Sequence, residues 1–112
     1  MSSVNDKLAI PAIVTYCMSK GGVSQMTRAT SIALAPHGIR VNAICPGSID
    51  TPMLRKAMEA DPATARFIEG SMPIGRLGKA EEIAEAVVWL CSDRASLVTG
   101  HSMGVDGGSV AR

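Results

Sequence analysis

GIRVNAICPG, residues 38–47, is the stretch that decides the fold. Between its first glycine and its Pro-Gly pair it is short and rich in apolar and β-branched residues, so it cannot form a long helix. An apolar run of this length is typical of a strand buried on both faces, and Pro46-Gly47 breaks it sharply. We therefore predict a buried strand over residues 39–45.

Helical patterns lie on both sides of this strand in the sequence. Residues 16–35 predict a helix whose apolar residues recur at mostly three- and four-residue spacing and form one face. That face comprises Val23, Met26, Ala29, Ala33 and Leu34. Residues 79–92, KAEEIAEAVVWLCS, predict a second helix, and Glu81 and Glu82 in its first turn complement the positive helix N-terminus.

Two further segments complete the pattern. Residues 48–78 contain Pro52, Pro62 and Pro73 and are predicted to be irregular or weakly helical; long segments of this kind often form a lid over a site. Residues 100–108, GHSMGVDGG, predict a short strand closed by a Gly-Gly turn, which is no phosphate loop because no helix follows it. Helix, strand, helix and strand alternate, and this order predicts a layered α/β fold.

The overall composition argues against several classes of protein. The chain has 112 residues, 46% of them hydrophobic and 19% charged, which is typical of a globular domain rather than a disordered chain. Its net charge is +1, and it has no basic tract or membrane-length apolar run, so we expect neither nucleic acid nor a membrane as a partner. Cys17, Cys45 and Cys91 are widely spaced with no CxxC pair, so we expect reduced thiols in a cytoplasmic protein and no metal site.

Tyr16 and Lys20 are the candidate catalytic pair. Since they are four residues apart on the predicted helix, their side chains lie on the same face. A lysine ammonium beside a phenol favours the phenolate, and such a phenol can exchange a proton with a substrate hydroxyl. A YxxxK match alone is common, so the assignment depends on the rest of the chain.

The remaining motifs resemble those of the short-chain dehydrogenase/reductase family. Ser3 lies thirteen residues before Tyr16, and Pro46-Gly47 begins thirty residues after it, which are about the distances found in the family. GIRVNAICPGSIDTPM, PIGRLGKAEEIAEAVVWLCSD and TGHSMGVDGG extend the match from about residue 1 to 109. The resemblance implies the C-terminal portion of a Rossmann-type, doubly wound parallel sheet. This would be one partial α/β domain over residues 1–112, with a lid-like segment at about 48–78.

The resemblance also implies the site residues. Tyr16 would exchange the proton, Lys20 would favour the phenolate and bind the nicotinamide ribose, and Ser3 would hold the substrate oxygen. The implied cofactor-binding residues are Tyr16, Lys20, Pro46, Gly47, Ile49 and Thr51. The implied cofactor is NAD or NADP, and the implied reaction is hydride transfer with a small-molecule secondary alcohol or ketone. Members of the family commonly form dimers or tetramers, so a homo-oligomer is expected.

One part of the family's pattern is absent from the sequence. The strand, glycine-rich turn and helix that would hold a cofactor pyrophosphate occur nowhere in the 112 residues. MSS at residues 1–3 fits the tail of the family's serine strand, so Met1 is expected to be an internal methionine of a longer enzyme. One hypothesis is a dehydrogenase represented by its catalytic half and inactive in isolation. The other is an inactive, truncated interaction protein that pairs through residues 16–35 and its final strand, with itself or with full-length subunits.

Some residues near these motifs are expected to be structural. Asn42 lies in the predicted buried strand and is interpreted as a hydrogen-bonded amide. His37 and His101 have no partner spacing that indicates a metal or a catalytic role. Cys17 and Met18 stand where small residues are usual in the family, and we expect them only to pack.

Overall fold

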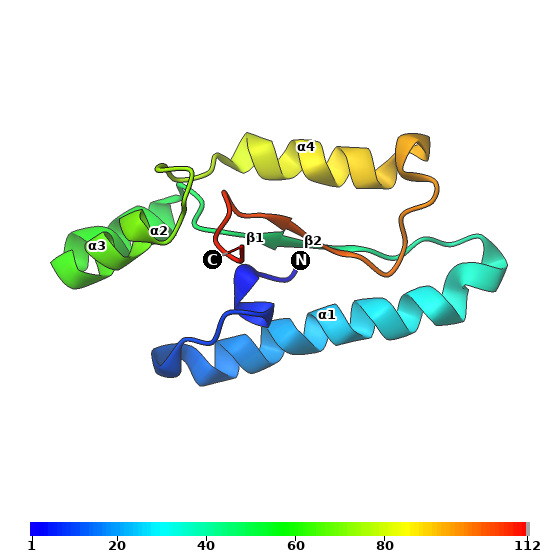
Figure 1. The fold of residues 1–112 in the computed structure, drawn as a ribbon, viewed down its shortest axis with the longest axis horizontal. Helices are drawn as coiled ribbons and strands as arrows, with labels where there is room; N and C mark the ends of the chain where they lie inside the picture. The colour runs from blue at the N-terminus through cyan, green and yellow to red at the C-terminus, as the bar shows by residue number, and fades with distance from the viewer. Residues whose placement is uncertain (112) are drawn as a thin grey trace.

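Two helices lie on opposite sides of a small parallel sheet. The computed structural model describes residues 1–111. Figure 1 shows helix α1 (Val14–Leu34) on one side of strands β1 (Ala43–Pro46) and β2 (Ser102–Val105), and helix α4 (Ala80–Cys91) on the other. This arrangement confirms the predicted layered α/β fold with a parallel sheet. Both predicted helices are present, and α1 begins two residues earlier than expected.

The first residues of the chain add a backbone hydrogen bond to the sheet, outside the two assigned strands. β1 pairs with β2 in parallel, with Ala43 opposite Ser102. On the other edge of β1, the Ser2 N–H donates to the Ile44 carbonyl oxygen at 2.8 Å. Residues 1–3 therefore lie along β1, where the sequence motif MSS predicted the end of a strand.

β1 starts four residues later than predicted. Before Ala43, side chains take part in the hydrogen bonds that join this segment to residues 98–101. The Val41 N–H donates to the Thr99 hydroxyl at 3.1 Å rather than to a strand carbonyl. The Asn42 amide donates to the Val98 carbonyl at 2.8 Å and accepts from the His101 N–H at 3.0 Å. Asn42 is thus the satisfied structural amide that the sequence predicted.

The apolar core lies between the sheet and α4. Its buried residues are Ile44, Ile83, Leu90 and Ala95. Partly buried side chains pack around them: Ile49, Ala86, Trp89, Val98, Met103 and Val105. The helix predicted over residues 79–92 is thus present as α4, and it packs on the sheet through Ile83 and Leu90.

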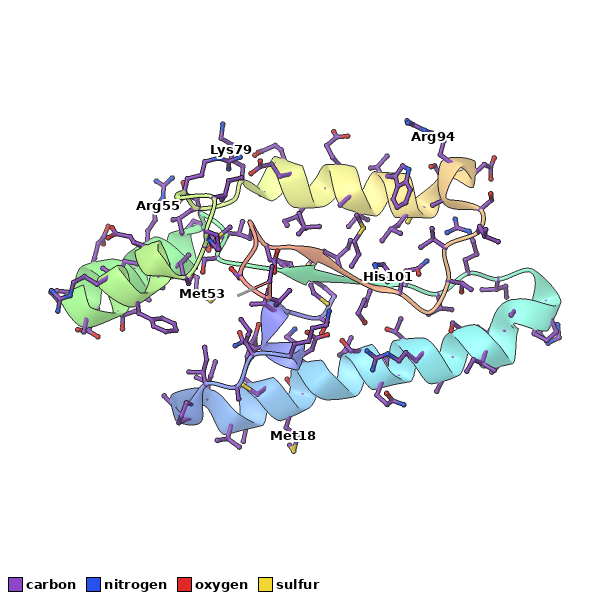
Figure 2. The ribbon with its side chains drawn as sticks, in the orientation of Figure 1. Met18, Met53, Arg55, Lys79, Arg94 and His101 are labelled. Carbon is purple, nitrogen blue, oxygen red and sulfur yellow. The ribbon has the colours of Figure 1, made fainter. Side chains whose placement is uncertain are left out.

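α1 packs on the rest of the fold through small polar residues and not through the apolar face identified in the sequence. Ser24, Thr27 and Ser31 are its buried residues, at three- and four-residue spacing. Met26, a member of the apolar face, is 61% exposed, and Met18 and Ile32 are exposed as well. Figure 2 shows Met18 on the side of α1 that faces away from the strands. The helix therefore packs through small polar side chains and leaves apolar ones on its outer side.

The segment expected to be irregular or weakly helical forms two helices. They are α2 (Pro52–Ala60) and α3 (Pro62–Gly70), which lie beyond one end of the sheet in Figure 1. Each begins with proline at its first position, where the missing N–H costs no helical hydrogen bond. Thr51 and Asp61 cap them: the Thr51 hydroxyl accepts from the Leu54 N–H, and the Asp61 carboxylate accepts from the Ala63 and Thr64 N–H groups.

No helix within residues 1–111 is long and apolar enough to cross a membrane. Cys17, Cys45 and Cys91 are all free thiols.

The start of α4 carries an ion pair whose effect on stability depends on pH. Arg76 contacts the Glu82 carboxylate at 2.6 and 2.9 Å, and the Lys79 N–H donates to the same carboxylate at 2.7 Å. These contacts, that of Arg76 above all, lower the pKa of Glu82 from 4.5 to about 2. The folded state therefore favours the ionised carboxylate.

We expect Glu82→Gln to lower the melting temperature at neutral pH. The advantage of the natural chain is fully present above pH 4.5 and disappears as the pH falls through about 2, because the carboxylate is then protonated in both states. Melting curves of both proteins across this range measure the difference. Glu81→Gln, in the same turn, is the matched control. A difference in melting temperature between Glu82→Gln and the natural chain that stays constant with pH would contradict the prediction.

Candidate active site

The first turns of α1 bring the predicted catalytic pair together. The Lys20 ammonium lies 5.4 Å from the centroid of the Tyr16 ring, as the four-residue spacing predicted. The Tyr16 side chain is 43% exposed, so the phenol is open to a small molecule. The pair therefore places a positive charge beside an exposed phenol.

Residues 1–3 are tied to this part of α1. The Lys20 ammonium also donates to the Met1 carbonyl oxygen at 3.3 Å. The Ser2 hydroxyl donates to the Lys20 carbonyl oxygen at 2.8 Å. Through these bonds, the segment that lies along β1 fixes the position of the helix that carries Tyr16.

Ser3 is near this pair in the fold, but its hydroxyl is occupied elsewhere. The side chain is buried and caps the short 3-10 helix Val4–Asp6. Its hydroxyl accepts from the Asn5 N–H and donates to the Asn5 side-chain oxygen, both at 3.2 Å. Within the described chain it makes no hydrogen bond to Tyr16 or Lys20, so a substrate oxygen would have to replace Asn5 as its acceptor.

A buried polar cluster behind this region was not predicted from the sequence. The Asp6 carboxylate accepts from the Ser24 hydroxyl at 2.5 Å and from the Cys45 thiol at 3.4 Å. Burial, and secondly the Asp6 charge, raise the pKa of Cys45. The Ser24 hydroxyl also lies 3.0 Å from that of Ser2, which links the cluster to residues 1–3. One sequence signal pointed to Ser24, because it continues the four-residue spacing of Tyr16 and Lys20 along one helix face.

The turn after β1 approaches the end of β2 very closely. A Cβ on Gly47 would lie 2.9 Å from the Asp106 Cα and 3.0 Å from its carbonyl oxygen, so only glycine fits. The Gly47 N–H donates to the Val105 carbonyl at 3.1 Å and continues the parallel pairing past Pro46. This contact sets the direction in which the chain leaves the sheet.

Beyond the turn, two groups are open to a ligand. Ile49 forms an isolated parallel bridge with Gly78, in which the bonds run from the Gly78 N–H to Ser48 and from the Asp50 N–H to Gly78. The N–H and C=O of Ile49 itself point to the opposite side, as the alternation of a strand requires. The Thr51 hydroxyl accepts from Leu54 as a helix cap, and its own hydrogen is available for an acceptor.

The residues present fit the nicotinamide end of a dinucleotide. The carboxamide of such a group carries an NH2 group that donates and a carbonyl oxygen that accepts, which match the backbone groups of Ile49 and the hydroxyl of Thr51. Within residues 1–111 there is no group of three side chains that could hold a metal ion.

Comparison with known proteins gives consistent results. A family model described as Enoyl-(Acyl carrier protein) reductase matches residues 1–110. "Short-chain dehydrogenase srdC" of Neurospora crassa is 42% identical over 109 residues, which are 97% of this chain and 40% of that protein. "3beta-hydroxysteroid dehydrogenase 1" of Eggerthella lenta is 42% identical over 108 residues, or 96% of this chain and 41% of the relative.

The solved structures agree with the curated relatives. A putative 2-deoxy-d-gluconate 3-dehydrogenase from Agrobacterium tumefaciens, with bound NADP, is 38% identical with a TM-score of 0.92. That similarity covers 99% of this chain and 45% of the solved one. The chain thus spans about two-fifths of the length of the curated relatives it matches.

Proposed function

Because the chain belongs to the short-chain dehydrogenase/reductase family, we propose that it carries the catalytic residues of an NAD(P)-dependent oxidoreductase. The reaction is hydride transfer between a nicotinamide and a small secondary alcohol or ketone. The observation that carries the proposal is the Lys20 ammonium held 5.4 Å from the ring of an exposed Tyr16. Residues 1–112 act as one partial domain, and residues 48–78 as a lid over the substrate.

Tyr16 exchanges the proton at the substrate oxygen. The positive charge of Lys20 stabilises the negative charge that develops on the phenol oxygen as its proton leaves. Ser3 orients the substrate oxygen by donating the hydroxyl hydrogen that Asn5 accepts in this structure. The nicotinamide supplies or accepts the hydride when it is bound.

The cofactor end of the site is formed by the turn after β1. Ile49 contributes its unpaired backbone groups and Thr51 its hydroxyl hydrogen to the carboxamide, while Pro46 and Gly47 pack against the ring. Lys20 binds the ribose in exchange for the Met1 carbonyl oxygen that it contacts at 3.3 Å. Support for NADP comes from the Agrobacterium tumefaciens relative, and NAD fits these residues equally well.

The proposal is tested with a chimera. The part of the Agrobacterium tumefaciens protein that precedes the aligned region is fused to Met1 of this chain. We expect the chimera to transfer hydride to or from NADP with members of a panel of secondary alcohols and ketones, and residues 1–112 alone to show none. A folded chimera that binds NADP and is inactive across the panel would overturn the proposal.

Thr51→Val in the chimera tests the contact with the carboxamide. The change keeps the volume and deletes the hydroxyl, so we expect NADP to bind about fivefold more weakly, which corresponds to about 1 kcal/mol for one neutral hydrogen bond. Calorimetry measures the dissociation constant. Thr51 also caps α2, so Asp61→Ala, which removes the cap of α3, controls for helix fraying. Equal effects of the two substitutions would contradict the contact.

A second candidate function is that of an interaction protein. Met18, Met26 and Ile32 are 71%, 61% and 76% exposed on the outer side of α1, an apolar surface that is often covered by a partner. A homo-oligomer in the cytoplasm, where three free thiols stay reduced, fits this surface. Sedimentation of residues 1–112 tests this candidate, and a monomer at all concentrations would exclude self-association.

A further inference from the structure

Ser3 lies in a short segment that Ser2 fixes to the fold at its start. The Ser2 N–H donates to the Ile44 carbonyl oxygen of β1 at 2.8 Å, and the Ser2 hydroxyl donates to the Lys20 carbonyl oxygen of α1 at 2.8 Å. Ser2 is 3% exposed, so both bonds are shielded from water. The residue before Ser3 is therefore held by one strand and one helix, between which the segment lies in Figure 1.

Asp6 fixes the other end of this segment to the same two elements. Its carboxylate oxygen Oδ2 accepts from the Ser24 hydroxyl of α1 at 2.5 Å and from the Cys45 thiol of β1 at 3.4 Å. Ser24 lies one helical turn beyond Lys20, and Cys45 directly follows Ile44. The two anchors of the segment are thus neighbours on the helix and neighbours on the strand.

The backbone connects the second anchor directly to Ser3. The Asp6 N–H donates to the Ser3 carbonyl oxygen at 3.0 Å, and Ser3 caps the 3-10 helix Val4–Asp6 that this bond begins. The Ser3 hydroxyl is bonded within the same turn, because it contacts the N–H and the side-chain oxygen of Asn5, both at 3.2 Å. A displacement of Asp6 would therefore move the backbone and the hydroxyl of Ser3 with it.

The other carboxylate oxygen of Asp6 shows that the group is not placed for stability alone. Oδ1 is buried and has no hydrogen-bond partner within the described residues. Burying a polar oxygen without a partner costs free energy, which offsets part of what the contacts of Oδ2 contribute. Local costs of this kind are expected at functional positions rather than at purely structural ones.

We propose that Asp6 is a positioning residue for hydride transfer. Its carboxylate holds the 3-10 turn so that the Ser3 hydroxyl can donate to the substrate oxygen that Tyr16 also contacts. The inference rests on the proposed function, because that function gives Ser3 a substrate oxygen as its acceptor. Asp6 touches neither substrate nor cofactor in this role, and its effect on the rate passes through Ser3.

The test uses the chimera and a double-mutant cycle between Asp6 and Ser3. We expect Asp6→Ala to lower kcat by about ten- to a hundredfold, the range that a small misplacement of a reacting group costs, with the Kd of NADP unchanged. Asp6→Asn keeps the size of the side chain and an acceptor for Ser24, so it should restore most of the rate. In a chimera that already carries Ser3→Ala, Asp6→Ala should cause no further loss, because the group through which it acts is gone.

Two buried serines of α1 provide a matched pair of variants. Ser24 and Ser31 are 3% and 5% exposed, and the Ser31 hydroxyl donates to a carbonyl of its own helix. We expect Ser24→Ala to lower kcat, as Asp6→Ala does, and Ser31→Ala to leave it unchanged. Hydrogen exchange of the Asn5 amide, which donates to the Ser3 hydroxyl, should become faster in both variants that lose activity.

The outcomes separate this inference from the proposed function. A parent chimera without turnover contradicts the proposed function, and the exchange of the Asn5 amide then still decides whether Asp6 holds the turn. A parent with turnover, in which Asp6→Ala lowers kcat equally with and without the Ser3 hydroxyl, contradicts only the role of Asp6. Equal effects of Ser24→Ala and Ser31→Ala on kcat, or unchanged exchange of the Asn5 amide in Asp6→Ala, would also overturn that role.

Discussion

Tyr16→Phe in the chimera is expected to reduce hydride transfer by about 10²–10⁴-fold, the usual contribution of a positioned acid–base group. The substitution deletes only the phenol oxygen and its proton. The ring remains beside the Lys20 ammonium, so the helix and the bound cofactor keep their positions. Steady-state rates with the best substrate of the panel measure the effect.

Two controls separate a catalytic loss from a folding loss. Met18→Leu changes an exposed side chain on the same turn of α1 and should leave the rate unchanged. NADP affinity and melting temperature of Tyr16→Phe should match those of the parent chimera. A Tyr16→Phe chimera with most of its activity would remove Tyr16 from the catalytic role.

Arg40→Ala is expected to give the largest loss of stability. The Arg40 guanidinium donates to the carbonyl oxygens of Leu90, Ser92 and Val98 at 2.8, 3.1 and 3.3 Å. Leu90 lies in the last turn of α4, where a cation offsets the partial negative charge of the helix end. Removing the group leaves several carbonyls without a donor, and we expect the free energy of unfolding to fall by about 2–3 kcal/mol.

Urea unfolding of residues 1–112 measures this loss. Arg94→Ala is the matched control, because it removes the same charge from an exposed side chain close to the same helix end (Figure 2). It should change stability by less than about 0.5 kcal/mol. Comparable losses in the two variants would show that charge, and not the three carbonyl contacts, explains the effect of Arg40.

The order of the elements could be predicted from local chemistry. Pro46-Gly47 marks the end of β1, and the glycines after β2 mark the last turn, because these residues interrupt regular structure. The four-residue spacing of Tyr16 and Lys20 placed the pair correctly, since it depends only on helix geometry. These features need no knowledge of distant contacts.

The packing of α1 could not be predicted from hydrophobicity. Thr27 and Ser31 are buried at low cost because their hydroxyls donate to carbonyls of their own helix, those of Val23 and Arg28. Their small size also lets other segments approach closely: a Cβ on Gly100 would lie 2.6 Å from the Ser31 hydroxyl oxygen. The apolar residues of the predicted face therefore do not show which side of the helix packs against the rest of the chain.

The bounds of the two helices in the lid-like segment, expected only to be irregular or weakly helical, could not be predicted for a different reason. Proline was taken as a sign of irregular structure, whereas Pro52 and Pro62 each start a helix behind a capping residue, Thr51 and Asp61. The Asp6 cluster could not be predicted, because its members come from three separate segments and meet only in the folded chain.

In the proposed function, this chain provides the catalytic residues and the nicotinamide contacts, while the pyrophosphate requires a glycine-rich turn absent from its sequence. The most direct test is a calorimetric titration of NADP into the chimera and into residues 1–112, with turnover measured on the same samples. The predicted result is saturable binding and turnover by the chimera, with neither from residues 1–112 alone. Binding by residues 1–112 as tight as that of the chimera, together with turnover, would contradict it.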